Sequence, residues 1–581
     1  MSFLLVVHDK DKKVSIPSIC NSAFEIHIDL FQGEEYSAEL HIGKIYSDYR
    51  IIDNSNNQVT MIYGRYFLNE GCSLLSSTEK ILENIHGSWL IIRQKKGNLI
   101  EIITDPGTSV PVYHIHKPFV DFYSDRLDFI AFCSGITLSV NWNHIFAFIL
   151  NGNVVGDLSI FNEIDVLFPY SFYSIGGVGK INIKSYFEDV LFKDDNPKIV
   201  DDSINAYIDT CKYPYNSKLN FILSLTGGYD SRVTFAATYS SVRKKLKTST
   251  FGLSSHKDVI VSRNISDRLK IPFIHIPNEE IESIIKDQDV ISQIDRISLL
   301  TGGLTRHSYL FSYFYHRALE KYGFQGEINS HGGELVKGTY YRSLTYTKGV
   351  KRFYLRINKR LLKRVSNKFY GPARSAIINL DKYIIEGSSP DNTGYSDYEL
   401  VDWSNLYNRF SRTWGSRHYS QMSDFFTYFP YMDMHFLRIA MRLPYEVKKN
   451  SRFSKYVPEK LVPEISDIKY GRVKPNYNYS RLSPLIDFGI RGLRFAKRKF
   501  FPTIKSSFPP ADIRLIIPFV EKNMQDVTVD AKKLFPESLN LVNIKRLKTD
   551  SDIARPKIYF RFYTVLRYLL GLANNGVRIE E

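Results

Sequence analysis

The sequence has few cysteines and no long apolar run. Its four cysteines, Cys20, Cys72, Cys133 and Cys211, are scattered and form no Cys-x-x-Cys pair. This spacing argues against a zinc site and a disulfide framework, and it suits a reducing compartment. No stretch reaches the roughly 18 apolar residues of a membrane-spanning helix. The first residues resemble a strand more than a signal peptide, because no basic leader precedes the apolar run. We therefore expect a cytoplasmic protein.

Acidic residues are outnumbered by basic ones, 61 to 77, which gives a formal net charge of +16. Such an excess attracts nucleic acid, an anionic membrane surface or an acidic substrate, although a solvated basic surface explains it as well. The hydrophobic content of 43% and the aromatic content of 14% are typical of a folded chain. A length of 581 residues allows about two to four domains.

The most informative stretch covers residues 219–232, where an apolar run of strand length ends in a polar turn. Residues 233–238 are able to begin a helix, which completes the strand–loop–helix layout of a phosphate site. Glycines in the turn bring backbone N–H groups close to an anion, and the helix adds the positive end of its dipole. Asp230 supplies an oxygen ligand for Mg²⁺. The alternative is a purely structural turn. The turn reads Thr226-Gly227-Gly228-Tyr229-Asp230-Ser231.

This turn resembles the pyrophosphate loop, Ser-Gly-Gly-X-Asp-Ser, of the N-type ATP pyrophosphatases. The resemblance implies ATP and Mg²⁺ as cofactors, with the Thr226 and Ser231 hydroxyls donating to the phosphates. Strand-like runs at 247–252, 272–276 and 326–330 alternate with helix-like segments, which predicts right-handed βαβ units and a parallel sheet. In asparagine synthetases the backbone of the first two strands holds the adenine. By resemblance, that role falls near Ser224, Phe251 and Gly252.

A second loop begins at His331-Gly332-Gly333-Glu334. It resembles the Ser-Gly-Glu-Gly-x-Asp-Glu loop of asparagine synthetases, and the alignment places Glu334 at the family's magnesium-binding aspartate. A glutamate carboxylate lies one methylene farther out, which matters because Mg²⁺ is strict about distance. Lasso peptide cyclases have a similar His-Gly-Gly-Asp stretch, so we expect His331 to accept a proton from an attacking amine. A loop histidine without a catalytic role is the alternative.

A third stretch, Asp467-Ile468-Lys469-Tyr470-Gly471, resembles the family's Arg-x-Lys-x-Gly motif. The resemblance makes Lys469 the catalytic cation that neutralises charge growing on the pyrophosphate and the tetrahedral centre. Asp467 departs from the family's arginine. A surface lysine is the alternative interpretation.

The first 180 residues contain short runs of alternating, β-branched and aromatic residues, which predict a strand-rich domain. Ser77 is expected to cap a short helix there. Three motifs resemble, in order, the glutaminase domain of asparagine synthetases. That family uses an N-terminal cysteine nucleophile, whereas this sequence has Ser2, and Tyr63-Gly64-Arg65 replaces its Asn-Gly-Glu glutamine clamp. We therefore expect a degenerate glutaminase domain that serves as a structural part. The motifs are Gly87-Ser88-Trp89, Asp105-Pro106-Gly107 and Pro111-Val112-Tyr113.

Together these features predict an α/β protein. An Ntn-hydrolase-like α+β sandwich precedes a parallel-sheet ATP pyrophosphatase domain of the adenine nucleotide α-hydrolase type. We expect the glutaminase-like domain at 1–180, a connector at 181–218, the ATP pyrophosphatase domain at 219–480 and a basic helical extension at 481–581.

The resemblance implies an ATP-dependent carboxylate–amine ligase that forms AMP and diphosphate. A carboxylate on a small molecule or a peptide attacks ATP to form an acyl-adenylate, and an amine or ammonia then displaces AMP. Without a cysteine nucleophile, glutamine is not expected to be the nitrogen donor. β-Lactam synthetases and lasso peptide cyclases, which use an amine of the substrate itself, are therefore the closest analogies.

Two other interpretations stay open. An RNA-modifying ATP pyrophosphatase fits the positive charge, but its sulfur-transferring versions need paired cysteines, so a nucleic-acid partner is disfavoured. A catalytically inactive ATP-binding protein fits the departures at Glu334 and Asp467. The basic amphipathic segment 485–501 leaves peripheral membrane contact open. The sequence does not determine the oligomeric state.

Overall fold

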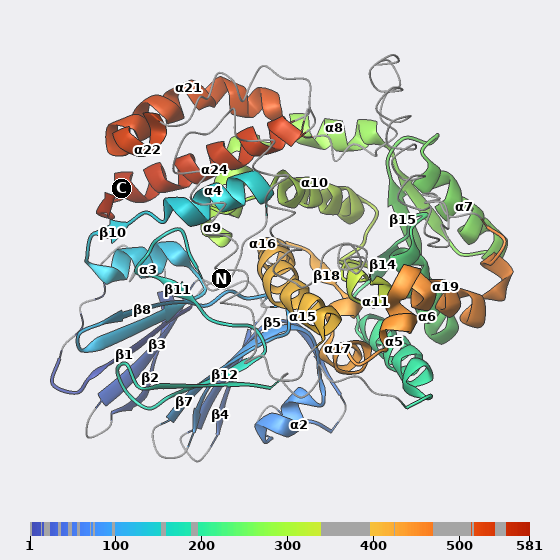
Figure 1. The fold of residues 1–581 in the computed structure, drawn as a ribbon, viewed down its shortest axis with the longest axis horizontal. Helices are drawn as coiled ribbons and strands as arrows, with labels where there is room; N and C mark the ends of the chain where they lie inside the picture. Colours follow the sequence, from blue (N-terminus) through green and yellow to red (C-terminus); the bar gives the residue numbers. More distant parts are fainter. Residues whose placement is uncertain are drawn as a thin grey trace.

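The computed structural model describes much of the chain in three regions (Figure 1). Two antiparallel sheets form the first region, a parallel sheet with helices on both faces forms the second, and C-terminal helices lie beside both. The described residues are 3–12, 14, 16, 24–32, 36–43, 49–54, 58–69, 71–73, 76–95, 99–107, 109–152, 158–186, 196–338, 396–422, 424–468, 513, 516–540 and 554–581.

The N-terminal region is a sandwich of two six-stranded antiparallel sheets. The first sheet has the order β11 (Asp165–Val166), β8 (Tyr113–Lys117), β9 (Val120–Ser124), β1 (Phe3–Asp9), β3 (Tyr36–Gly43) and β2 (Phe24–Gln32). The second has the order β13 (Ile181–Ser185), β12 (Ser171–Ile175), β7 (Leu99–Thr104), β6 (Ile85–Lys95), β5 (Gln58–Leu68) and β4 (Tyr49–Asn54). The helices of this region are α2 (Thr78–Leu82), α3 (Leu127–Ser134) and α4 (Trp142–Asn151).

Strand alternation gives the first sheet two apolar faces. Phe3 and Leu5 point into the core between the two sheets, whereas Leu4 and Val6 point to the opposite face, which contacts α3 and α4. This arrangement follows from the two-residue period of a strand. As predicted, Ser77 caps α2, where its side chain accepts a hydrogen bond from the Lys80 N–H at 3.3 Å.

The second region is built on a five-stranded sheet in which all neighbouring strands are parallel. Its order is β16 (Phe273–Ile276), β15 (Thr248–Phe251), β14 (Phe221–Ser224), β17 (Gly326–Ile328) and β18 (Phe426–Tyr428). Helices in the first half of this region are α5 (Ile199–Asn216), α6 (Tyr229–Val242), α7 (Lys257–Leu269), α8 (Asn278–Lys286), α9 (Val290–Leu300), α10 (His307–Lys321) and α11 (Glu334–Lys337).

After the undescribed residues 339–395, further helices complete this region. They are α15 (Asp397–Ser404), the π-helix η2 (Asn405–Trp414), α16 (Gly415–Met422), η3 (Pro430–Met432), α17 (Met434–Ala440), α18 (Tyr445–Lys448), η4 (Lys449–Ser451), α19 (Arg452–Leu461) and η5 (Pro463–Ile465).

The central strand β14 is packed on both faces. Ile222 shares a core with residues of α8, α9 and α10, whereas Phe221 and Leu223 share another with residues of α6 and α7. A parallel strand covered on both sides is expected to be apolar throughout, which explains the continuous apolar run in the sequence. The predicted α/β class, an antiparallel sandwich followed by a parallel sheet, is confirmed.

The described C-terminal residues join the two other regions. They form α21 (Ile517–Leu534), α22 (Pro536–Asn540), α24 (Ala554–Asn574) and β19 (Ile579–Glu580), and β19 pairs in parallel with β10 (Leu138–Ser139). α24 contributes to a core shared with α4, α9 and α10 (Figure 1). The predicted boundaries at 180, 218 and 480 remain predictions, and the segment 485–501 lies outside the described residues. None of the described helices combines the length and apolar character needed to cross a bilayer.

Arg561 of α24 caps the C-terminus of α4 in a buried contact. Its Nη1 donates to the carbonyl oxygens of Phe148 and Ile149 at 3.1 and 2.6 Å. Gly152 ends α4 with φ +74°, and a Cβ there would lie 2.7 Å from Arg561 Cζ. Only a residue without a side chain leaves room for the guanidinium.

We therefore expect Gly152→Ala to lower the free energy of unfolding by about 2–3 kcal/mol, because it adds a clash to left-handed backbone strain. Gly576→Ala is the matched control. Its φ is also positive, at +95°, but no atom lies within 4 Å of an added Cβ. Thermal unfolding of both variants measures the difference, and equal losses of stability would contradict a structural role for the Arg561 cap.

Candidate active site

In the turn after β14, the side-chain hydroxyl groups form hydrogen bonds with other groups of the same turn. The Thr226 N–H donates to Ser231 Oγ at 3.1 Å, the two side-chain hydroxyls lie 2.9 Å apart, and the Gly228 N–H donates to Thr226 Oγ1 at 3.2 Å. α6 begins at Tyr229 with Gly228 as its N-cap, earlier than the expected 233–238. Asp230 and Ser231 therefore lie in the first turn of the helix, where the dipole favours negative charge.

A carboxylate from the neighbouring helix α7 also accepts a hydrogen bond from the backbone of this turn. The Gly227 N–H donates to Oδ1 of Asp258, in the first turn of α7, at 3.0 Å. The sequence interpretation did not include Asp258. Its only signal was its place at the start of the helix after the neighbouring strand β15, since parallel strands bring such positions to one edge of the sheet.

Asp230 is the most perturbed group of the turn. Its Oδ2 forms an ion pair with Lys337 Nζ at 2.5 Å, while its buried Oδ1 has no hydrogen-bond partner among the described residues. Burial raises the pKa of Asp230 to about 6; the charge of Glu334 also raises it, and Lys337 opposes both effects. A buried carboxylate oxygen without a donor, near a second carboxylate, fits the oxygen-only ligand preference of Mg²⁺.

Two glycines allow this carboxylate pair to form. A Cβ on Gly333 would lie 2.3 Å from Asp230 Cγ, and a Cβ on Gly332, whose φ is +113°, would lie 2.5 Å from Tyr431 Cβ. The loop after β17 can therefore approach α6 only without a side chain at Gly333, and approach η3 only without one at Gly332. This contact brings Glu334, at the start of α11, towards Asp230.

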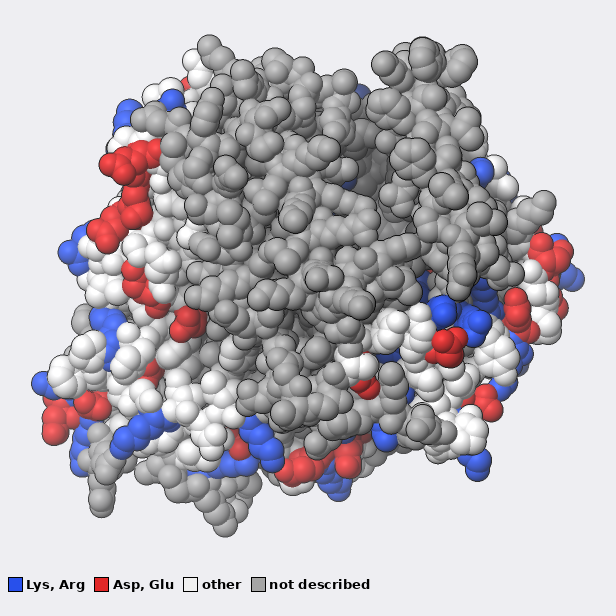
Figure 2. Space-filling view, in the orientation of Figure 1, with Lys and Arg blue, Asp and Glu red and all other residues white. Residues whose placement is uncertain are grey.

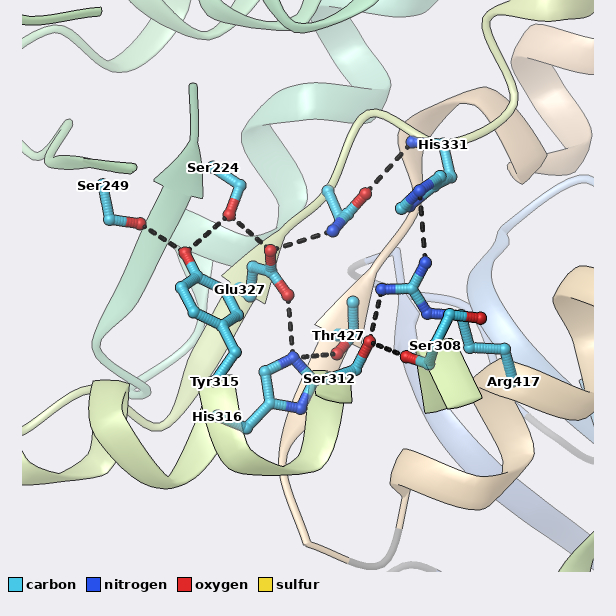
Figure 3. Close-up of polar contacts among 11 residues, drawn as sticks. Ser224, Ser249, Ser308, Ser312, Tyr315, His316, Glu327, His331, Arg417 and Thr427 are labelled. Atoms are coloured by element: carbon cyan, nitrogen blue, oxygen red, sulfur yellow. Dashed lines mark hydrogen bonds and ion pairs between the residues drawn. The ribbon is translucent and has the colours of Figure 1, made fainter. Parts of the chain in front are cut away.

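Beside the end of β14, Glu327 of β17 is the centre of a buried polar network (Figure 3). The Ser224 hydroxyl donates to Glu327 Oε1 and lies 3.0 Å from the Tyr315 hydroxyl, which in turn lies 2.9 Å from Ser249 Oγ. His316 Nε2 lies 2.9 Å from Glu327 Oε2. Burial alone would raise the pKa of Glu327, but the contacts with His316 and Ser224 lower it below its usual value.

Ser224 was predicted to contact ATP, and its hydroxyl contributes here to the network that supports the sheet edge. Phe251 and Gly252 lie at the end of the adjacent strand β15, two and three residues beyond Ser249, which pairs with Ser224. The Gly252 N–H donates to the Ile276 carbonyl at 3.0 Å, and its φ is +130°. The ATP-binding roles of these residues remain predictions.

His331 lies at the same edge of the sheet. Arg417 Nη1 donates to His331 Nε2 at 3.2 Å (Figure 3). The His331 ring also lies 4.4 Å from that of Trp414. Because a guanidinium only donates, Nε2 is the acceptor in this contact. His331 therefore takes a proton at Nε2 only after Arg417 moves away. Burial lowers the pKa of Arg417 to about 10.

The predicted catalytic residue Lys469 lies outside the described residues. The residues immediately before it are held by the second region. The Ile468 carbonyl accepts from Arg232 Nη1, on α6, at 2.7 Å, and Asp467 forms an ion pair with Arg268 of α7. Asp467, which stands where the family has an arginine, therefore has an ion-pair partner in this chain.

A family model described as asparagine synthase matches residues 216–466. This range contains the parallel sheet, the turn after β14 and the loop with Glu334. Residues 216–466 form an asparagine synthase domain. Members of this family are typically ATP-dependent ligases that form amide bonds. No curated protein matches the chain in a sequence search.

Two solved structures are among those that a structure search finds similar to this chain. An NH3-dependent NAD synthetase from Campylobacter jejuni is 14% identical, covers 34% of this chain and 98% of its own, and has a TM-score of 0.18. A glutamine phosphoribosylpyrophosphate amidotransferase from B. subtilis is 10% identical, covers 48% of this chain and 75% of its own, and has a TM-score of 0.17.

We expect Gly333→Ala to displace the Asp230 carboxylate from its predicted position beside bound MgATP, and to weaken MgATP binding at least about tenfold. Isothermal titration with MgATP measures the change. Gly571→Ala is the control, because no atom lies within 4 Å of an added Cβ there. Unchanged affinity in Gly333→Ala would show that MgATP binding does not depend on the position of Asp230.

The raised pKa of Asp230 predicts a pH effect of definite sign. Between about pH 4 and 6 the unfolded carboxyl group ionises while the folded one stays protonated, so the folded state binds more protons and loses stability as the pH rises. Relative to Asp230→Asn, the wild type should lose about 2 kcal/mol over this range and then level off. Thermal unfolding at each pH measures this, and a difference that stays constant with pH would contradict the assignment.

Proposed function

We propose that the asparagine synthase domain adenylates a substrate carboxylate with ATP and transfers the acyl group to an amine or ammonia. The observation that supports this most directly is the pair of carboxylates, Asp230 and Glu334, brought together beside a glycine turn at a helix N-terminus. That arrangement suits a nucleotide whose phosphates carry Mg²⁺.

The chemistry explains why ATP is needed. A carboxylate and an amine do not condense at neutral pH, because the carboxylate is a poor electrophile. In the proposed first step, a carboxylate oxygen bonds to the α-phosphorus of ATP, and the bond from that phosphorus to pyrophosphate breaks. In the second step, the amine nitrogen bonds to the acyl carbon, the bond to AMP breaks, and the amine releases a proton.

Each part of the site has a proposed role in these steps. The backbone of residues 226–231 would bind the pyrophosphate, and Asp230 with Glu334 would hold Mg²⁺, which supplies charge neutralisation when bound. Lys337, which the sequence interpretation missed, already places its ammonium group against Asp230. With Asp230 engaged as a metal ligand, the Lys337 ammonium group would be free to reach towards the phosphates.

His331 and Arg417 would assist the amine that attacks the acyl-adenylate. Arg417 donates to His331 Nε2 and, at 2.5 Å, to Ser312 Oγ. If a carboxylate or a phosphate oxygen attracted the guanidinium, the Nε2 lone pair would be free to take the proton of the attacking amine. Lys469 would add positive charge at the transition state, as its resemblance to the family's lysine implies.

The N-terminal sandwich contributes structure to this proposal. At the positions of the family's glutamine clamp, the Tyr63 hydroxyl lies 3.4 Å from the Tyr419 hydroxyl and Arg65 Nε donates to the Met422 carbonyl at 3.2 Å. Side chains at these positions therefore bind α16 of the synthase domain. This supports a degenerate domain and an amine, or free ammonia, as the nucleophile. Ser2 lies outside the described residues.

The substrate is proposed to be a small-molecule or peptide carboxylate. Intramolecular cyclisation, as in lasso peptide or β-lactam formation, is the form that agrees best with the replaced glutamine clamp at Tyr63 and Arg65. On the face shown in Figure 2, the described Lys and Arg side chains are interspersed with Asp and Glu. The visible described surface on that face therefore gives no support to a nucleic-acid partner.

Pyrophosphate release tests this function. The full chain is incubated with MgATP and a panel of carboxylic acids and peptides, with and without amines, and release is followed by a coupled assay. We expect release that depends on an added acid, and Asp230→Ala should reduce it at least about 100-fold because the buried carboxylate ligand is lost.

Asp209→Ala is the matched control, because Asp209 is an exposed aspartate that pairs with Lys212 on α5. It should retain the activity of the wild type. Release that depends on RNA would instead identify an RNA-modifying enzyme. ATP binding without any release would identify an inactive binding protein, and either result would overturn the proposal.

A further inference from the structure

A cluster of histidines lies on the N-terminal sandwich, in a different region from the ATP site. His27 is opposite His41 across β2 and β3, and Val6 is opposite Glu39 across β1 and β3. His8 lies two residues beyond Val6 on β1 and points to the same face. Four potential ligands thus come from three neighbouring strands and share one face of the first sheet.

The donor atoms of these side chains converge. One ligand atom each from His27, Glu39 and His41 lie within 4.8 Å of one another. His27 Nδ1 is 3.1 Å from His41 Nδ1, and Glu39 Oε2 is 3.3 Å from His41 Nε2. These two distances end at different ring nitrogens of His41, and a single ion binds only one of them. Ligand atoms of a tetrahedral zinc site stand about 3.3 Å apart, so the exposed His27 or the half-buried Glu39 would have to turn towards the same nitrogen of His41 to complete one.

His8 adds an argument from hydrogen bonding. Its Nδ1 lies 2.9 Å from the Asp9 carbonyl oxygen, which can only accept, so Nδ1 carries a hydrogen. In the neutral ring, Nε2 then presents a lone pair to Glu39 Oε1, 3.5 Å away. A metal ion between the two atoms would be bound by both acceptors. A backbone carbonyl that fixes the other ring nitrogen is also the usual outer contact of a metal-binding histidine.

We propose that His27, Glu39 and His41, with His8 as a fourth donor, bind one divalent transition-metal ion of the class that prefers imidazole, represented by Zn²⁺. Such an ion would fasten β1, β3 and the edge strand β2 to one another. Its role would be to stabilise the sandwich, and it does not depend on the proposed ligase activity.

Zinc titration of the full chain tests this site. The protein, with any purification tag removed, is freed of metal with a chelator and titrated with Zn²⁺ by calorimetry. We expect one zinc ion per chain and a rise in melting temperature on binding. His27→Gln and Glu39→Gln should each weaken the affinity at least about tenfold and remove the thermal shift, because each deletes one ligand.

His116→Gln is the matched control, because His116 is half-exposed on the same sheet but contacts Asp121 instead of the cluster. It should bind zinc as the wild type does. Substitution with Co²⁺ adds a geometric readout, since intense visible absorption reports tetrahedral coordination. Absence of saturable binding, unchanged affinity in the His27 and Glu39 variants, or loss of binding in the control would each overturn the proposal.

Discussion

The active-site edge depends on the burial of one carboxylate. Asp230 is held in the first turn of α6, with Lys337 on one oxygen and no donor among the described residues on the other. Apolar packing keeps this group partly buried, because Val233 and Phe235 of α6 lie in two hydrophobic cores. The burial disfavours the charged form of Asp230. A site that binds a cation gains from such an arrangement, because the cation meets a carboxylate that is already partly desolvated, with its side chain 23% exposed.

A second constraint is the fixed contact between the sandwich and the synthase domain. Ser88 Oγ lies 2.8 Å from His418 Nδ1, and the Tyr419 hydroxyl donates to Asp125 Oδ2 at 2.5 Å. Asp125 also accepts from the Phe3 N–H at 2.8 Å. Because these residues are buried, each hydrogen bond would be costly to lose. α16 therefore carries Arg417 towards His331 on one side and is bonded to the sandwich on the other.

Much of the site was predictable because its chemistry is local in sequence. The strand, the glycine turn and the helix around Asp230 form one continuous segment, so their order alone indicated a phosphate site. The same holds for the loop with Glu334. Lys337, Asp258, Glu327 and Arg417 were missed because their partners are distant in sequence, and a lone lysine or glutamate has no distinctive local pattern.

The histidine cluster illustrates the same limit. Cysteine spacing gave no sign of a zinc site, and His8, His27 and His41 follow no metal-binding spacing either. Only strand pairing places them together, since β1 lies beside β3 and β3 beside β2. The C-terminal helices are similar, because their amphipathic pattern did not indicate that α24 would share a core with α4 and α9.

By itself, the sequence determined the class of the chain, its glycine turns and the type of ligand each turn presents, because backbone freedom and residue chemistry are local properties. The tertiary structure decided which carboxylate is desolvated, which cation faces it and which histidine nitrogen is engaged. Those outcomes depend on distances between segments far apart in the chain, and electrostatic energies in a buried site vary steeply with such distances.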